Sequence, residues 1–321
     1  MKYVFDVERD IMENVIVTGA TSFIGISLIN RLMRKNINVY AIARPHSSRL
    51  NCIPDAPNVH IIESELDDLA GLVLPVKNCD VLYHIAWSSD FISPRFNIDG
   101  QMINVRYAEN AMKLAEKHRC TTFLGVGSQA ECGLIDGCIT SSTKPNPKTA
   151  YAIAKVAAYD SLMNMCSING MKLCWPRLLS AYGPYDRPHT LIMSLLSSCF
   201  NNKSIALTQA TQIWDYIYID DVAEAIYQIS EKGHHAKRYP IGSGVGRSLR
   251  SYIEEIAQIT GNDNILTGIG KKEYASGQVM NLLADMSDVY HDTGFICQET
   301  FSSGIRKTID FMKENSDIYN I

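Results

Sequence analysis

The stretch Asn14-Val-Ile-Val-Thr-Gly-Ala-Thr-Ser-Phe-Ile-Gly25 decides the fold of this 321-residue chain. Its first part, up to Ala20, is an apolar run that predicts a buried strand ending in a tight turn. Apolar residues then recur at the spacing of a helix, at Ile24, Leu28, Ile29, Leu32 and Met33. Gly19 permits the tight turn and Gly25 permits close packing of the helix on the strand. The start of the helix would then present free N–H groups to a pyrophosphate.

The same alternation of apolar strands and amphipathic helices continues along the first half of the chain. Further strands are expected over 39–43, 58–62, 80–86, 121–126 and 171–175, and helices over about 99–117 and 150–165. Strands separated by helices indicate right-handed βαβ units and a parallel sheet covered on both faces. We therefore expect an α/β fold, with a Rossmann-type doubly wound parallel sheet and a smaller mixed α/β C-terminal substrate lobe.

The lobe is expected where this regular rhythm loosens, after Tyr182-Gly-Pro184. Residues 14–184 are expected to form the nucleotide-binding domain, and residues 215–244 to return to it. Residues 185–214 and 245–321 are assigned to the substrate-binding lobe. Residues 1–13 form an N-terminal extension that precedes the first strand.

The composition is that of a globular chain without a strongly basic face. Hydrophobic residues make up 46% and charged residues 20%, and the net charge is -4. This balance argues against nucleic-acid or membrane partners, which need a basic or apolar surface. Nine cysteines without a C-x-x-C pair predict reduced thiols in a cytoplasmic protein, and no metal site. The first 14 residues do not resemble a signal peptide, and no apolar run approaches the ~20 residues of a membrane span.

A second pattern, Tyr151-Ala-Ile-Ala-Lys155, indicates proton transfer. A spacing of four residues on a helix places both side chains on one face. An ammonium beside a phenol favours the phenolate and lowers a pKa that starts near ~10. Such a tyrosine can exchange a proton near neutral pH. Ser128 lies just after the strand expected over 121–126 and 23 residues before Tyr151.

Taken together, these residues make the chain resemble the extended short-chain dehydrogenase/reductases, over about residues 14–313. The first turn is similar to their TGxxGxxG sequence, with Ser22 at the usual middle glycine. The resemblance implies a nicotinamide dinucleotide at the carboxyl ends of the strands. The cofactor-binding residues that it implies are Gly19, Thr21, Ser22, Phe23, Ile24, Gly25, Glu65, Leu66, Ile85, Ala86, Tyr151, Lys155 and Leu178.

The end of the second strand indicates which dinucleotide binds. An acidic residue there holds the adenosine ribose hydroxyls of NAD. This chain has Ala43-Arg-Pro-His-Ser-Ser-Arg49 instead, without a carboxylate. Arg44 is placed to meet a 2′-phosphate with help from Ser47, so NADP is expected ahead of NAD, which stays the alternative.

The resemblance assigns catalysis to Ser128, Tyr151 and Lys155. The serine would bind the reacting oxygen, the tyrosine would transfer its proton, and the lysine would also hold the nicotinamide ribose. Trp87 and Gln129 are expected to contact the substrate. No metal ion is expected to take part.

Two further segments resemble those of members that act on nucleotide-diphosphate sugars. Pro176-Arg-Leu-Leu-Ser-Ala-Tyr-Gly-Pro184 is similar to their R-x-x-N-x-Y-G-P element, with Ser180 in place of asparagine. Trp214 stands where such members carry an arginine for the substrate diphosphate. Ser180 and Trp214 are therefore expected at the substrate, and the phosphate contacts must differ here.

The residues after Ser128 separate the reactions of this family. A 4,6-dehydratase carries an Asp-Glu pair directly after the catalytic residue, and a 3,5-epimerase/reductase carries a cysteine two residues after it. This chain has Gln129 and Ala130, which weakens both hypotheses. Arg44 favours an NADPH-dependent reduction of a nucleotide-linked 4-keto-6-deoxyhexose. Similarity to CDP-abequose- and dTDP-deoxyhexose-type reductases over 215–221 and 239–244 favours it too.

Two alternatives stay open at this point. One is an NAD-dependent nucleotide-sugar 4-epimerase like UDP-glucose 4-epimerase, and the other, against which the intact catalytic set argues, is a non-catalytic cofactor-sensing regulator. The helices expected over about 100–117 and 150–165 are apolar on more than one face. Because equivalent helices form a two-fold interface in relatives, a homodimer is expected.

Overall fold

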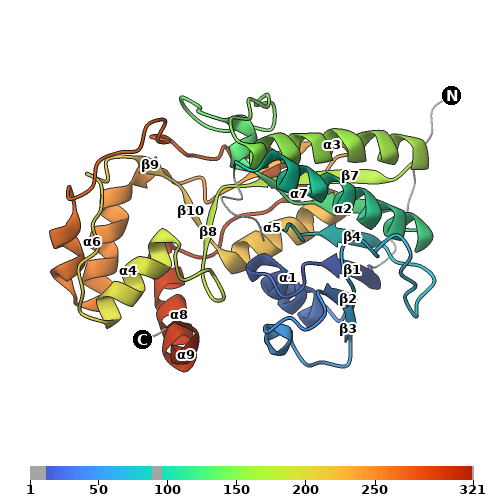
Figure 1. Cartoon of the computed structure of the whole chain (residues 1–321), viewed down its shortest axis with the longest axis horizontal. Coiled ribbons are helices and arrows are strands. Elements are labelled where there is room, and N and C mark those ends of the chain that lie inside the picture. Colours follow the sequence, from blue (N-terminus) through green and yellow to red (C-terminus); the bar gives the residue numbers. More distant parts are fainter. Residues whose placement is uncertain (1–11, 89–95, 320–321) are drawn as a thin grey trace.

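A computed structural model describes residues 12–88 and 96–319, and Figure 1 shows its ribbon. Within the described residues, eight parallel strands form the main sheet, in the order β11-β7-β5-β4-β1-β2-β3, with β6 beside β7. The strands are β1 (Asn14–Thr18), β2 (Asn38–Ala43), β3 (Val59–Glu63), β4 (Val81–His84), β5 (Thr122–Gly125), β6 (Gly127–Ser128), β7 (Lys172–Leu178) and β11 (Arg238–Ile241). This order is that of a doubly wound dinucleotide-binding sheet, so the expected fold class is confirmed.

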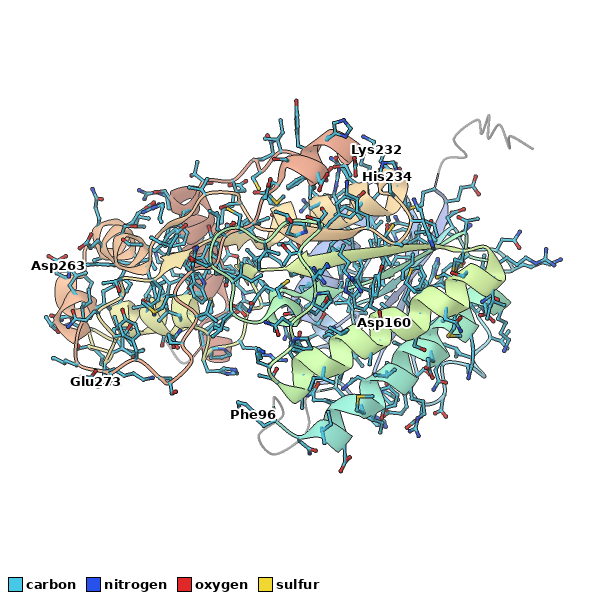
Figure 2. The ribbon with its side chains drawn as sticks, turned by 90° about the horizontal axis from the view of Figure 1, so that it is seen from above. Phe96, Asp160, Lys232, His234, Asp263 and Glu273 are labelled. Atoms are coloured by element: carbon cyan, nitrogen blue, oxygen red, sulfur yellow. The ribbon has the colours of Figure 1, made fainter. Side chains whose placement is uncertain are left out.

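Helices cover both faces of this sheet, because successive side chains of each strand point to opposite sides. Val15 and Val17 of β1 join the core beneath α1 (Phe23–Arg34) and α5 (Ile219–Lys232), whereas Ile16 joins the core beneath the other pair of helices. That second pair is α2 (Ile98–Lys117) and α3 (Ala150–Asn169), which lie side by side in Figure 2, with Asp160 labelled on α3.

The remaining elements build the smaller lobe at one end of the molecule (Figure 1). Its helices are α4 (Leu191–Phe200), α6 (Leu249–Thr260), α8 (Phe301–Glu314) and α9 (Ser316–Tyr319), and its short strands are β9 (Ile213–Trp214) and β12 (Arg247–Ser248). Two further short strands, β8 (Ser180–Tyr182) and β10 (Tyr216–Tyr218), pair between lobe and sheet. Asp263 and Glu273 mark the far end of the lobe in Figure 2.

The structure refines two sequence expectations. Strand β7 continues past the expected residue 175 to Leu178, and Pro176 lies within it. Helix α7 (Ser287–Thr293) falls in the range expected for the lobe, yet it packs on α5 and β11 of the sheet domain. Residues 1–11 of the N-terminal extension lie outside the described residues. All nine cysteines are free thiols, and no helix of the described residues is long and apolar enough to cross a membrane.

Candidate active site

The turn after β1 leaves no room for side chains at its two glycines. Gly19 has a φ of +73°, and a Cβ atom there would lie 2.7 Å from the backbone N of Ala86. A Cβ on Gly25 would lie 2.2 Å from the carbonyl oxygen of Gly19. Ser22 caps α1, since its hydroxyl accepts a hydrogen bond of 3.0 Å from the Gly25 N–H. The serine therefore fits the turn as a helix cap, and Thr21, Phe23 and Ile24 beside it are half-buried.

The ends of β2 and β3 bring together the residues expected to choose the dinucleotide. Arg44 is exposed directly after β2, and the Ser47 hydroxyl lies 3.5 Å from the Thr21 hydroxyl of the first turn. A carboxylate also lies here, which the sequence did not indicate. Glu63, at the end of β3, accepts a 2.9 Å hydrogen bond from the backbone N–H of His46. The signal was the parallel pairing of β2 with β3, which sets Ala43 opposite Glu63.

The next two expected contacts, Glu65 and Leu66, follow β3 on the same side. Glu65 is exposed, and Leu66 is half-buried against the core beneath α2 and α3. Asn110 of α2 donates to the carbonyl oxygens of Leu66 and Asp67 at 3.4 and 3.1 Å. These bonds fix the backbone of the segment and leave the Glu65 carboxylate toward solvent.

His84, at the end of β4, connects the two central strands. Its Nδ1 lies 2.9 Å from the hydroxyl of Thr18, the last residue of β1. Burial and, after it, the charge of Lys155 lower the pKa of His84 to about 3. The imidazole is therefore neutral at physiological pH and holds the strand ends beside Ile85 and Ala86.

Trp87 contacts both Tyr151 and Lys155, the two residues of the Y-x-x-x-K pattern. The Nζ of Lys155 lies 3.6 Å from the centre of the Trp87 ring, and the Tyr151 ring meets Trp87 edge-on at 5.9 Å. The indole N–H donates to the Gln101 Oε1 at 2.8 Å, which fixes the ring. The structure thus places Trp87, which was expected at the substrate, directly against Tyr151 and Lys155.

Lys155 is held by the backbone directly after β5. Its Nζ donates a 2.7 Å hydrogen bond to the carbonyl oxygen of Val126 and lies 5.9 Å from the centre of the Tyr151 ring. Burial lowers the pKa of Lys155 to about 7, and the nearby carboxylate of Glu131 opposes this effect. Charged and neutral lysine are therefore close in free energy near neutral pH.

Ser128 begins a one-turn 3-10 helix over Gln129–Cys132 that packs against α3. The Ser128 hydroxyl accepts from the Ala130 N–H at 3.2 Å, and the Glu131 carboxylate accepts from the Ser128 N–H at 2.8 Å. Gln129, half-buried, follows Ser128 at the same strand end. The reciprocal cap fixes the serine at the carboxyl end of the sheet.

Ser180 and Trp214, which replace the asparagine and the arginine of the family pattern, are hydrogen-bonded to each other. The indole N–H of Trp214 donates to the Ser180 hydroxyl at 2.8 Å. Trp214 also lines a cavity of about 340 Å³ between α4, α6 and the loop before β9, among mostly apolar residues, with Lys272 and His189 as its basic side chains. Leu178, the last residue of β7, is buried at the sheet end.

The geometry of the strand ends fits a dinucleotide. Gly19 and Gly25 keep the first turn open to close approach, and the capped start of α1 points its N–H groups there. Such a group would lie along the ends of β1, β2 and β4, from Arg44 to Tyr151. Within the parts of the chain that the structure describes, no group of three or more His, Cys, Asp or Glu could hold a metal ion.

Comparison with known proteins agrees with this geometry. The family model for the NAD dependent epimerase/dehydratase family matches residues 15–242. The chain is 21% identical over 337 residues to dTDP-glucose 4,6-dehydratase of Neisseria meningitidis, covering 95% of this chain and 94% of the relative. It is 24% identical over 312 residues to CDP-abequose synthase of Salmonella muenchen, with 95% and 99% covered.

A solved structure has the same fold over nearly the whole chain. The dTDP-glucose 4,6-dehydratase of Bacillus anthracis, in complex with NAD, superposes with a TM-score of 0.83 at 20% identity. The superposition covers 96% of this chain and 99% of that protein. The sheet and the lobe are therefore both shared with that enzyme.

Proposed function

This chain belongs to the NAD-dependent epimerase/dehydratase family, and we propose that within it the enzyme reduces a nucleotide-linked 4-keto-6-deoxyhexose with NADPH. The observation that supports this proposal most is the set of side chains at the carboxyl end of the sheet. Tyr151, Lys155 and Ser128 gather there, while the turn after Ser128 offers no acid or base for a dehydration.

The state of Glu131 supports the exclusion of a dehydratase. It is the one carboxylate in the turn over residues 128–132, and it is fully buried. Its two oxygens accept from the Ser128 N–H, the Trp175 indole N–H and the Arg177 guanidinium. A carboxylate used in this way cannot reach a sugar carbon, and Gln129 and Ala130 cannot exchange protons at neutral pH.

The proposed mechanism assigns one task to each side chain. NADPH, when bound, supplies the hydride for the C4 carbonyl of the sugar. The Tyr151 hydroxyl donates a proton to the C4 oxygen as it becomes an alkoxide, and the Ser128 hydroxyl donates a hydrogen bond to the same oxygen. Lys155, held against Trp87, supplies the positive charge that favours the resulting tyrosinate.

The choice of NADPH rests on Arg44 and Ser47. Both follow β2, and Ser47 lies against the first turn. An arginine there meets a 2′-phosphate with a charge-assisted contact. Glu63 favours NAD instead. Its carboxylate at the end of β3 would repel a 2′-phosphate, and it suits a ribose with free hydroxyls.

Glu63 is the observation that favours a second candidate, the NAD-dependent nucleotide-sugar 4-epimerase. Such an enzyme uses the same tyrosine, serine and lysine but returns the hydride to the sugar, so no cofactor is consumed. The two candidates differ in net redox change and share the catalytic residues.

Substitution of Tyr151 by phenylalanine tests the shared chemistry. Loss of a positioned acid lowers kcat by about 10² to 10⁴. We expect Tyr151→Phe to keep the fold and the cofactor affinity while nearly abolishing NADPH oxidation with a nucleotide-linked 4-keto-6-deoxyhexose. Gln129→Ala serves as the matched control and should cost far less. Near wild-type turnover in Tyr151→Phe would contradict the proposal, and interconversion of UDP-glucose and UDP-galactose by the wild type without added cofactor would favour the epimerase.

We also propose a homodimer in the cytoplasm. Helices α2 and α3, which pack together, expose four large apolar side chains, namely Ile98, Met102, Ile153 and Ile168, at 44%, 38%, 43% and 76%. Exposed apolar side chains on such a helix pair suit a protein interface. The nine free thiols suit a reducing compartment. Light scattering at micromolar concentration should give twice the 35.8 kDa chain mass, and a monomer would contradict the dimer.

A further inference from the structure

A fully buried ion pair lies beneath Ser128. The Arg177 Nε donates to the Glu131 Oε2 at 2.9 Å, and neither side chain is exposed to solvent. The other carboxylate oxygen, Oε1, accepts from the Ser128 N–H at 2.8 Å and from the Trp175 indole N–H at 3.1 Å. Burial of two charges is costly unless each is fully paired, so the pair calls for an explanation beyond simple packing.

The same pair also holds the segment that leads to Tyr151. The Arg177 Nη1 donates to the carbonyl oxygen of Thr143 at 2.8 Å, and the carbonyl oxygen of Glu131 accepts from the Asn146 N–H at 2.8 Å. Thr149, three residues later, caps α3 through the Ala152 N–H. Tyr151 lies in the first turn of that helix. Ser128 is therefore bonded to Glu131, and the segment before Tyr151 is bonded to both Glu131 and Arg177.

The strand above the pair is shaped to fit it. A Cβ on Gly127 would lie 2.6 Å from the Glu131 Oε1 and 2.4 Å from the Trp175 Nε1. A Cβ on Gly125 would lie 2.4 Å from the Trp175 ring. The Gly-Val-Gly sequence before Ser128 therefore lets the backbone pass directly over the indole and the carboxylate.

We propose that Glu131 and Arg177 are positioning residues, which fix Ser128 and the start of α3 as one rigid unit around the reacting oxygen. The inference rests on the proposed function, because it assigns these two residues to the alignment of the proposed catalytic groups. Glu131 acts through the backbone of Ser128, and Arg177 acts through the segment before Tyr151.

The charges around Glu131 come from three elements. Arg177 on β7 and Lys155 and Tyr159 on α3 face it, with Cys132 beside it in the turn and Arg238 on β11 close to Cys132 and Tyr159. The carboxylate favours the ammonium form of Lys155, whereas burial and the charge of Lys155 hold His84 neutral. Removal of the Glu131 charge should therefore also move the pH profile of turnover to lower pH.

Two neutral double variants separate positioning from stability. Glu131→Gln with Arg177→Met keeps an oxygen that can accept from the Ser128 N–H, whereas Glu131→Leu with Arg177→Met removes it. Neither leaves an unpaired buried charge. We expect the leucine variant to lose about 10² in kcat relative to the glutamine variant, since misplacement by about 1 Å has effects of this size. The KM for the cofactor should be equal in both.

A control pair shows what a purely structural role would do. Lys237 binds Asp292 at 2.6 Å between β11 and α7, and Asp292 is 4% exposed. Asp292→Asn with Lys237→Met should lower the melting temperature without a change in kcat or in the pH profile. If the two Glu131 double variants share one kcat and differ only in melting temperature, the positioning role is contradicted.

A second readout needs no substrate. Hydrogen exchange of the Ser128 amide, followed by NMR in the cofactor-free protein, should be protected in the wild type and in the glutamine variant and fast in the leucine variant. Equal protection in both variants would overturn the proposal. If the wild type turns over no nucleotide-linked ketone, the proposed function fails, and the amide exchange still decides whether Glu131 and Arg177 position Ser128.

Discussion

The cofactor side and the lobe side of the site accommodate their departures from the family pattern in different ways. At the first turn, the usual glycine is Ser22, and the backbone is unchanged because the serine acts as a helix cap. In the lobe, two departures occur together, and Trp214 donates to Ser180 at 2.8 Å. A binding site formed by backbone atoms keeps its geometry and tolerates few substitutions. In a site formed by side chains, two contacting residues can be replaced together.

The largest effect is expected for a substitution in the turn after β1. Gly25→Val places atoms within van der Waals contact of the Gly19 carbonyl oxygen, which a Cβ alone would approach to 2.2 Å. Because the closest obstructing atoms belong to the Gly19 backbone, we expect a loss of about 3 kcal/mol in the free energy of unfolding and no measurable cofactor binding. Ser22→Gly is the control, with a loss of only a few tenths of a kcal/mol. Tight cofactor binding in the valine variant would contradict this picture of the turn.

The second effect concerns the buried charge on the cofactor side. The pKa of Lys155 falls from 10.5 in the unfolded chain to about 7 in the fold. Between these values the unfolded chain binds a proton that the folded protein does not, so stability rises with pH through this window. Relative to Lys155→Met, the wild type should gain about 2 kcal/mol in the free energy of unfolding between pH 7 and pH 9. Denaturant titrations at both pH values measure this difference, and a constant difference would place the lysine in water.

The third effect concerns cofactor choice. If Arg44 meets a 2′-phosphate, NADPH should bind at least about tenfold tighter than NADH, or about 1.4 kcal/mol. Arg44→Asp should erase or invert that preference, and Glu63→Gln should increase it because a repulsive charge is lost. Fluorescence titrations with both cofactors measure the ratio, and equal affinities in the wild type would contradict the role of Arg44.

The smallest effect is expected for nucleotide affinity after substitution of Trp214 and Ser180 in the lobe. Trp214→Arg with Ser180→Asn restores the residues that relatives carry at both positions. A restored cation near the cavity should strengthen binding of UDP by about fivefold, or about 1 kcal/mol, as expected for a partly exposed ion pair. Calorimetry measures the affinity. Weaker binding of UDP in the double variant would show that the wild-type indole itself contacts the nucleotide.

The sequence predicted β1 to β5 and β7 because most of them are apolar runs, and their alternation with helices predicted a parallel sheet. It did not predict β6 and β11 as strands, because Gly127-Ser128 and Arg238-Tyr-Pro-Ile241 are short and not continuously apolar. It also predicted Tyr151 and Lys155 on one helix, with Ser128 at a strand end. Glu63 beside His46 and the Glu131–Arg177 pair were not predicted. These contacts join residues far apart in the chain, and their register depends on packing that no local pattern encodes.

Transfer of label from cofactor to sugar tests the proposed reaction most directly. The enzyme is mixed with NADPH deuterated at the transferred position and with a nucleotide-linked 4-keto-6-deoxyhexose, and the product is analysed by NMR and mass spectrometry. We expect one deuterium at C4 of the sugar for each cofactor oxidised, and none with Tyr151→Phe. A sugar inverted at C4 without label, with no net oxidation of added cofactor, would contradict a reductase and identify an epimerase.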